Sequence, residues 1–241
     1  MFGLVASLVS LNGWSAGEKP GWFTALLSRA AQSDSVEGEK ARQMLLQTPG
    51  WEEKLLLVAA SPNPRERALA AQMLYLSKRA GAVDQLILLM ADPDKDVRKK
   101  ALGKAALWKD SSQRSRFEDV LLERLSREDD SGIRVLILDL LARFGSSRAL
   151  PQFIKGLREP NELAREISIH ALGNLLDERP VSNDVISALR NTAENGHPND
   201  RIVAFYYLTR FPDGSGRLLL EKIAGNDPDA TIKEAANAAL K

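Results

Sequence analysis

The sequence predicts an all-α protein, an α-α superhelix of about seven helical pairs. Two observations lead to this prediction: a pair of side chains with a fixed six-residue spacing recurs along the chain, and amphipathic helical segments alternate with short turns. The basic members of the recurring pair follow one another at intervals of 27 to 36 residues, a period typical of solenoids. Because one helical pair cannot bury its apolar side alone, we expect the pairs to stack.

The recurring pair joins an acidic or small polar residue to an arginine or lysine. Its copies are Asp34–Lys40, Ser61–Arg67, Asp92–Arg98, Glu128–Arg134, Glu159–Arg165, Asn195–Arg201 and Asp227–Lys233. We expect the oxygen-bearing side chain, such as Asp92 before Pro93, to cap the next helix. The helix dipole does not favour a cation in the first turns. The basic side chain is therefore expected to bond to the acidic turn of a neighbouring repeat, which gives a structural ladder of Asp92, Arg98, Arg134, Arg165, Arg201 and Lys233.

Each basic residue is followed by small or aliphatic residues three, four and seven positions later. After Arg165 these are Ser168, Ile169 and Leu172, which share one face of an α-helix. A second amphipathic segment precedes each turn, at residues 82–90, 117–125, 150–157, 184–192 and 216–224. The expected domain is a solenoid over residues 20–241, with approximate repeats at 20–49, 50–79, 80–110, 111–147, 148–180, 181–213 and 214–241. Residues 1–19 would form an N-terminal cap, or the remnant of a signal or anchor.

The Asp92/Arg98 copy, with Val97 and Ala101, resembles the HEAT-repeat family, as does the run from Arg165 through Ala171-Leu172-Gly173. The similarity is to short bacterial HEAT-like repeats of the phycobilin-lyase type, in which a turn aspartate and an arginine six residues later are the hallmark. It extends from about residue 20 to the C-terminus and implies the fold rather than a function. Two copies depart from the pattern: one has Lys104 at a position that is apolar in the other copies, and the Ser61–Arg67 pair lacks the acid.

Composition excludes several kinds of site. The chain of 241 residues has no cysteine, so disulfide scaffolds, thiolate zinc sites and cysteine nucleophiles are excluded. Its formal net charge of +1 gives little attraction to nucleic acid or anionic membranes. The apolar stretch at residues 1–14 is too short to span a bilayer as a helix. We expect a cytoplasmic protein without membrane insertion, or an exported or periplasmic one if residues 1–16 are a signal remnant.

No catalytic residue, metal site or cofactor is expected. Neither His170 nor His197 is followed by glutamate, and HEAT-like deoxyhypusine hydroxylases bind iron through His-Glu pairs. The two histidines could meet across one layer, but ordinary groove and turn positions explain them equally well. The aspartates at 92, 94 and 96 begin like a calcium loop, yet Val97 and Gly103 stand where that loop needs glycine and glutamate. They are expected to form a helix-capping turn.

Two functional alternatives follow from relatives of the fold. A phycobilin-lyase-like protein would handle a tetrapyrrole, but without cysteine this chain offers no obvious covalent handle. HEAT-like alkylpurine DNA glycosylases use tryptophans and a carboxylate. Here Trp14, Trp22 and Trp51 lie near the N-terminus, where we expect them to pack, and only Trp108 with Asp110 fits that pattern.

The function we expect is a non-catalytic scaffold or adaptor that presents a concave helical surface to a protein or peptide. Positions one, two and five after each basic residue should face that groove. The candidate partner-binding residues there are Leu136, Asp139, Ile167, His170, Val203 and Tyr206. The alternative is that tight curvature buries these side chains between layers.

A basic segment is the second candidate surface. Between Lys95 and Arg116, eight basic and two acidic side chains give a net charge of +6. Lys99, Lys100 and Lys104 would there dock an acidic protein, or else form an ordinary solvated face. The final helix has small apolar residues at Ala235, Ala236 and Ala239, followed by Leu240. These predict self-association at that end, or a fragment of a longer array.

Overall fold

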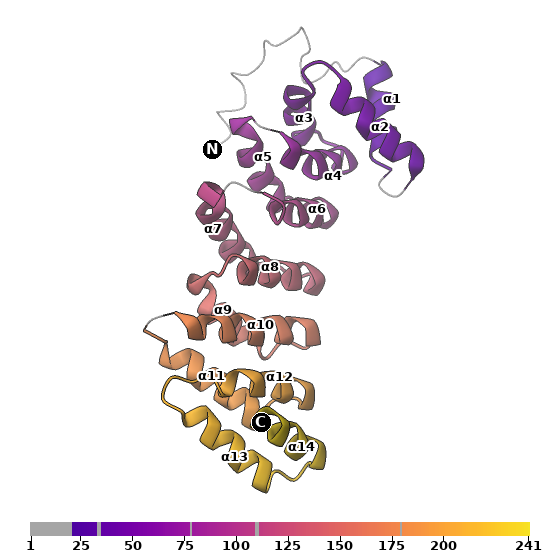
Figure 1. Cartoon of the computed structure of the whole chain (residues 1–241). Coiled ribbons are helices and arrows are strands. Elements are labelled where there is room, and N and C mark those ends of the chain that lie inside the picture. Colours follow the sequence, from indigo (N-terminus) through magenta and orange to yellow (C-terminus); the bar gives the residue numbers. More distant parts are fainter. Residues whose placement is uncertain (1–20, 33–34, 78, 109–110, 179) are drawn as a thin grey trace. The chain divides into compact units, whose positions relative to one another are not determined.

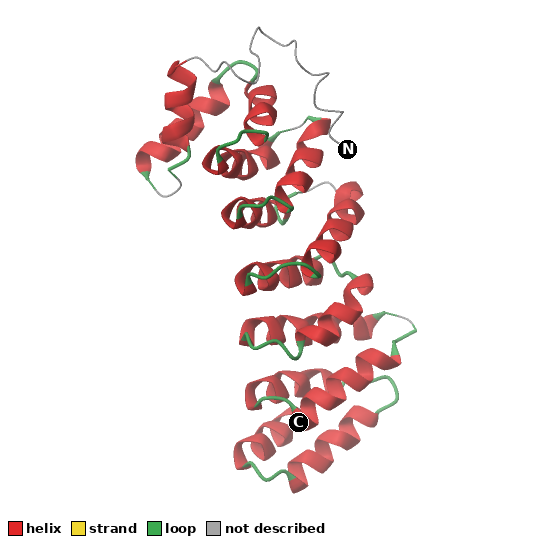
Figure 2. Cartoon of the chain, turned by 180° about the vertical axis from the view of Figure 1, so that it is seen from behind, coloured by secondary structure: helices red, strands yellow, loops and turns green. Residues whose placement is uncertain are grey.

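The computed structural model describes residues 21–32, 35–77, 79–108, 111–178 and 180–241. Within them the chain forms fourteen α-helices and four short 3-10 turns, with no strand (Figures 1 and 2). The predicted all-α class and the helical-pair architecture are confirmed. The expected N-terminal cap at 1–19 lies outside the described residues, as does Asp34.

The chain divides into two compact units, Met1–Val120 and Leu121–Lys241. In the first unit, α1 packs on α2, α3 on α4 and α5 on α6, and α4 also packs along α6. Its helices are α1 (Gly21–Ala30), α2 (Val36–Gln47), α3 (Trp51–Ala59), α4 (Pro64–Met73), α5 (Ala80–Met90) and α6 (Lys95–Ala105). The boundary between the units falls within α7 (Arg114–Leu125).

The second unit repeats the same arrangement. Its helices are α8 (Ser131–Arg143), α9 (Leu150–Gly156), α10 (Glu162–Asn174), α11 (Asn183–Asn195), α12 (Pro198–Leu208), α13 (Ser215–Asn226) and α14 (Ala230–Ala239). The second helices of the pairs, α8, α10, α12 and α14, pack on one another in chain order, and α11 lies between α9 and α13 (Figure 1). One face of this unit is thus built from second helices and the other from first helices.

In several pairs, among them those of α4, α6, α8, α10 and α14, the second helix begins at a capping residue two positions after the residue we expected to cap. Asp94 caps α6 by accepting hydrogen bonds from the backbone N–H groups of Asp96 (2.9 Å) and Val97 (3.2 Å). Asp92 instead accepts from the N–H of Asp94 (2.9 Å). The cap must directly precede the first helical residue, and Asp92 is three residues before Lys95. The expectation that Asp92 caps the helix is therefore wrong.

The apolar positions three, four and seven residues after each arginine form the core of the second unit. Ile169, Leu172 and Phe205 are each at most 1% exposed. Ser168 is fully buried among them, and its hydroxyl donates to the carbonyl of Ala164 (2.7 Å). The predicted buried face is confirmed.

Candidate binding surfaces

The repeated arginines bond to main-chain carbonyl oxygens of their own turns, and several also reach a carboxylate of the next repeat. Arg165 donates from Nη1 to the carbonyl oxygens of Glu159 (3.0 Å) and Pro160 (3.1 Å) in its own turn. Its Nε donates to Oδ2 of Asp200 in the next repeat (2.6 Å). The six-residue spacing follows from this geometry, because it places one side of the guanidinium against the carbonyls of its own turn while the other side reaches the next layer.

The same bridge recurs in both units. Arg67 donates to the carboxylate of Asp92 (2.7 and 2.8 Å) and to the carbonyl oxygen of Ser61 (2.9 Å). The missing acid in the Ser61 copy does not affect Arg67, because the acid that Arg67 binds belongs to the next turn. In the second unit Arg134 pairs with Glu159, and Arg201 pairs with Asp227.

One member of the ladder meets a carboxylate that the six-residue pairing does not indicate. Arg165 pairs with Asp200 and not with the turn residue Asn195, whose side-chain amide bonds to Asn191 at the end of α11 (3.0 Å). Asp200 lies in the first turn of α12 and is buried, so it supplies the carboxylate nearest to Arg165. Arg98 is buried and donates to the carbonyl oxygens of Asp92 (2.9 Å) and Pro93 (3.0 Å).

The last repeat contains Asp227 and Lys233. The bond from Arg201 is the largest cause that holds the pKa of Asp227 below its usual range, and the charge of Lys233 lowers it further. In the first repeat, Lys40 is exposed, and Arg42 is the buried basic side chain that reaches the carbonyl of Ala30 (2.9 Å). The ladder is a device of layer packing, because its arginines are occupied within the protein.

The face made by α8, α10 and α12 carries the candidate groove residues. Tyr206 is 66% exposed and His170 is also exposed. The other candidates on this face are half-buried: Leu136, Asp139, Ile167 and Val203. The alternative that curvature buries this whole set is wrong for Tyr206 and His170. Asp139 is held by an ion pair with Arg143 (2.7 Å) on the same helix.

His170 and Tyr206 meet in an aromatic cluster between α10 and α12. The hydroxyl of the buried Tyr207 lies 2.6 Å from Nδ1 of His170, and the two rings stand edge to face with centroids 5.8 Å apart. Tyr206 packs its ring edge-on to Tyr207, at 4.9 Å between centroids. Burial raises the pKa of the Tyr207 phenol, and the nearby charge of Arg210 partly opposes that shift.

Two residues outside the predicted set position this cluster. A Cβ atom on Gly173 would lie 2.2 Å from the Tyr207 ring, so only glycine leaves room for that ring against α10. Arg210 lies 5.6 Å from the centroid of the same ring and pairs with Asp177 (2.5 Å). The sequence gives a signal for Gly173, because a glycine within a helical run often marks a close contact. Nothing in the sequence indicates that Arg210 contacts the preceding repeat.

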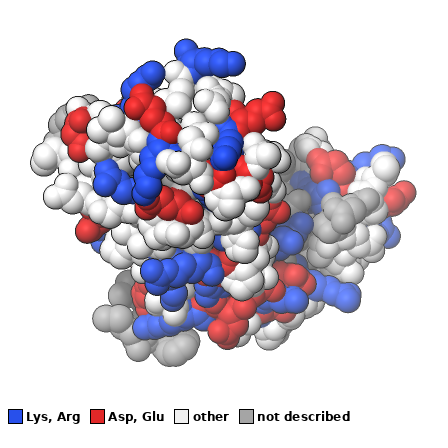
Figure 3. Space-filling view, turned by 90° about the horizontal axis from the view of Figure 1, so that it is seen from below, with Lys and Arg blue, Asp and Glu red and all other residues white. Residues whose placement is uncertain are grey.

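Two side chains of the basic segment already have partners within the first unit. Lys104 lies over the ring of Tyr75, with its ammonium 4.8 Å from the centroid, and Arg116 pairs with Asp84. Lys99 is exposed and Lys100 is half-buried on α6. Lys109 and Asp110 lie outside the described residues. On the face seen in Figure 3, blue and red groups are interspersed rather than gathered by sign.

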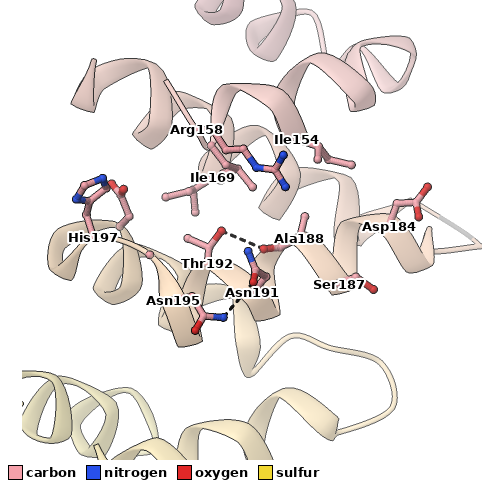
Figure 4. A pocket seen from close by; sticks show the side chains of 13 residues that line it. Ile154, Arg158, Ile169, Asp184, Ser187, Ala188, Asn191, Thr192, Asn195 and His197 are labelled. Atoms are coloured by element: carbon pink, nitrogen blue, oxygen red, sulfur yellow. Dashed lines mark hydrogen bonds between the residues drawn. The ribbon is translucent and has the colours of Figure 1, made fainter. Parts of the chain in front are cut away.

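Sequence reasoning missed an open cleft of about 570 Å³ between α9 and α11 (Figure 4). Its walls combine apolar side chains with polar ones, among them Ile154, Ile169, Arg158, Asn191 and His197. The cleft arises because α9 has only seven residues and α11 has thirteen, so the last turns of α11 extend beyond the end of α9. Such a difference in helix length could not be read from the repeat period.

The two histidines lie in separate parts of the second unit. His170 lies in the aromatic cluster on the second-helix face, whereas His197 lines the cleft beside α11. Among the described residues, no group of three or more histidine or carboxylate side chains could hold a metal ion. No helix within the described ranges combines the length and the apolar character needed to cross a membrane.

The first unit has its own hollow, of about 740 Å³, between α1 and α2. Trp22 and Met44 line it, and both are more than half exposed. Trp22 is therefore only partly packed, through an edge-on contact with the Phe23 ring (5.6 Å between centroids). Phe23, its neighbour in the helix, takes the core position, and adjacent helical residues point in different directions.

The α14 helix buries Ile232 and Ala236, while Ala235, Ala239 and Leu240 are half-buried. The carbonyl oxygen of Leu240 accepts a hydrogen bond from Arg217 (3.4 Å). Self-association through this end stays a prediction.

Comparison with known proteins supports the fold. Residues 118–201 match the family model of HEAT repeats. The sequence has no match among curated proteins. A solved archaeal HEAT-like repeats protein from Thermococcus onnurineus NA1 is similar over 92% of this chain and 97% of its own, with 14% identity and a TM-score of 0.56.

Two further solved structures are similar at comparable identity. An engineered protein matches 78% of this chain and 94% of its own, with 18% identity and a TM-score of 0.50. The CpcE–CpcF complex of phycocyanin lyase from Nostoc sp. PCC7120 matches 68% of this chain and 100% of its own, with 17% identity and a TM-score of 0.47. At these identities the likeness concerns the fold alone. The chain thus has a helical-repeat fold, and its residues 118–201 match HEAT repeats.

Proposed function

We propose that the protein is a non-catalytic scaffold whose second-helix face, at α10 and α12, binds a segment of a protein partner. The observation that carries this proposal is the exposure of Tyr206, at 66%, on a ring that packs edge-on to the buried Tyr207. A tyrosine held in this way presents a large amphipathic surface at small cost in conformational entropy, which is typical of residues that dominate binding energy.

The surroundings of Tyr206 fit an interface. Ile202, one turn earlier on α12, is 39% exposed, and Ile167 and Val203 are half-buried beside it. Polar groups border this apolar strip, since Glu166 and His170 are exposed on α10, with 3.7 Å between Glu166 Oε1 and His170 Nε2. An apolar centre with a polar rim is the usual anatomy of a protein interface.

The charged groups of this face favour binding over chemistry. Asp177 is occupied by Arg210, Asp139 by Arg143, and the ring nitrogen of His170 by the Tyr207 hydroxyl. Each of these groups is thus engaged by a neighbouring side chain. The scaffold needs no cofactor for binding of this kind. An acidic partner for the Lys99–Lys104 segment remains a separate prediction.

The proposal is tested by selecting peptides from a random display library against the whole chain and measuring the affinity of the selected peptides for two variants. Tyr206→Ser removes the proposed anchor, and we expect it to weaken binding at least tenfold, or about 1.4 kcal/mol or more. Leu218→Ser is the matched control, since Leu218 is equally exposed (68%) but lies on the first helix α13. Equal affinity for the two variants would show that the partner binds elsewhere.

A further inference from the structure

The cleft between α9 and α11 is a second polar site that the proposed scaffold function does not use. Most of its lining comes from the first helices α9 and α11, whereas Tyr206 and His170 lie on second helices. Its volume of about 570 Å³ is within the range of small-ligand and peptide sites. Ile154, Leu157 and Ala188 supply apolar surface there, so the cleft combines an apolar floor with polar edges.

Arg158 is the arginine that lines this cleft. It is exposed just beyond the end of α9, and within the described residues its guanidinium makes no hydrogen bond or ion pair. Figure 4 shows it reaching toward α11, with Asn191 across from it. The arginines of the ladder are all committed to turns, so Arg158 differs from them in having its donors available. A guanidinium with free donors is suited to binding a carboxylate.

The opposite wall carries a row of side chains that can both donate and accept hydrogen bonds. Ser187, Asn191 and Asn195 line the cleft at four-residue intervals along α11. Four helical residues rise about 6 Å, which is close to the roughly 6.6–6.8 Å spanned by two residues of an extended chain. The hydrogen bond from Asn195 Nδ2 to Asn191 Oδ1 (3.0 Å) leaves Asn191 Nδ2 and Asn195 Oδ1 available.

Side chains of opposite charge lie near the two ends of the row. Arg158 lies toward the end of α11, whereas Asp184 lines the cleft near its start, about 10 Å away along the helix from Asn191. The other carboxylate at the cleft, Asp200, is buried and neutralised by Arg165 (2.6 Å). A ligand therefore meets positive charge at one end of the cleft and negative charge at the other.

We propose that this cleft binds an extended acidic peptide segment. One carboxylate of the peptide pairs with Arg158, and its main-chain amides bond to the row of Ser187, Asn191 and Asn195. A peptide is favoured over a simple anion because only a repeating chain of donors and acceptors uses the whole row. Asp184 disfavours a second acid at the other end, so a single acidic residue is preferred.

The probes are three sets of heptapeptides whose termini carry no charge. Each set has one fixed central residue (Glu, Gln or Lys) and randomised flanking residues. Binding of each set to the full chain is measured by fluorescence anisotropy. We expect the Glu set to bind at least fivefold more tightly than the Gln set. Arg158→Gln should abolish that preference, and Arg158→Glu should transfer it to the Lys set. Asn191→Ala should weaken binding of the Glu set. Lys155→Ala, an exposed change on the same helix, should change nothing.

Several outcomes would overturn the proposal. These are no binding by any set, no preference for Glu in the native chain, or a preference that survives Arg158→Gln. Sodium acetate is the comparison for a simple anion: displacement of the Glu set by acetate at the peptide's own concentration would show an anion site and refute the peptide. Tyr206→Ser should leave binding of the Glu set intact, so failure of this cleft and failure of the second-helix face are distinguishable.

Discussion

Arg165→Ala tests the ladder at its most buried bridge. Arg165 is 8% exposed and its partner Asp200 is 4% exposed, so solvent screens their pairing little. The substitution removes the ion pair and two bonds to main-chain carbonyl oxygens. Breaking a buried pair by removing one partner costs about 3–5 kcal/mol, because the remaining charge is left without compensation.

The free energy of unfolding is measured by urea denaturation followed by circular dichroism at 222 nm. We expect Arg165→Ala to lose about 3–5 kcal/mol relative to the native chain, and Lys155→Ala, an exposed change on α9, to lose less than about 0.5 kcal/mol. Together with the single variant Asp200→Ala, the double variant Arg165→Ala/Asp200→Ala completes a cycle that isolates the pair, with an expected coupling of about 1–3 kcal/mol. An Arg165→Ala loss as small as that of Lys155→Ala would refute the bridging role.

Three further predictions follow from named contacts. Gly173→Ala should lower the free energy of unfolding by about 1–3 kcal/mol, because its Cβ would overlap the Tyr207 ring. Gly103→Ala is the control, a helical site with nothing within 4 Å of the added atom, and it should raise the free energy of unfolding by up to about 1 kcal/mol. The reverse order of stabilities in urea denaturation would refute the packing argument. Asp227 has a lowered pKa in the folded state, so its contribution to stability is present near neutral pH and is lost as the pH falls below about 4; Asp227→Asn should flatten this acid loss, and an unchanged pH profile between 7 and 3 would contradict it. Replacing Lys99, Lys100 and Lys104 on α6 with glutamate should abolish capture of an acidic protein without changing the circular dichroism spectrum. Capture that persists would place that partner elsewhere.

The repeat pattern predicted the fold because it depends on local chemistry. The spacing from Arg165 to Ile169 and Leu172 fixes a helical face, and burial of that face is what drives stacking. The six-residue pairing also predicted that arginines contact neighbouring turns. It did not predict which carboxylate each arginine meets, because Asp200 lies inside a helix and only the three-dimensional approach of α10 and α12 brings it to Arg165.

The candidate surfaces were less predictable. Helical position alone placed His170 and Tyr206 on the same face, but the link between them is Tyr207, which a one-helix pattern treats as a core residue. The cleft beside Arg158 depends on the unequal lengths of α9 and α11. Such a difference arises from where each helix ends, and helix boundaries are the part of a sequence-based prediction that is least reliable.

The proposed binding of a protein partner at the face around Tyr206 can be tested by amide chemical-shift mapping on the full ¹⁵N-labelled chain, with a peptide selected from the random library. We expect the largest shifts at exposed residues of α10 and α12, including His170 and Tyr206, and we expect Tyr206→Ser to remove them. Shifts confined to α6, or to other helices without change at α10 and α12, would contradict it.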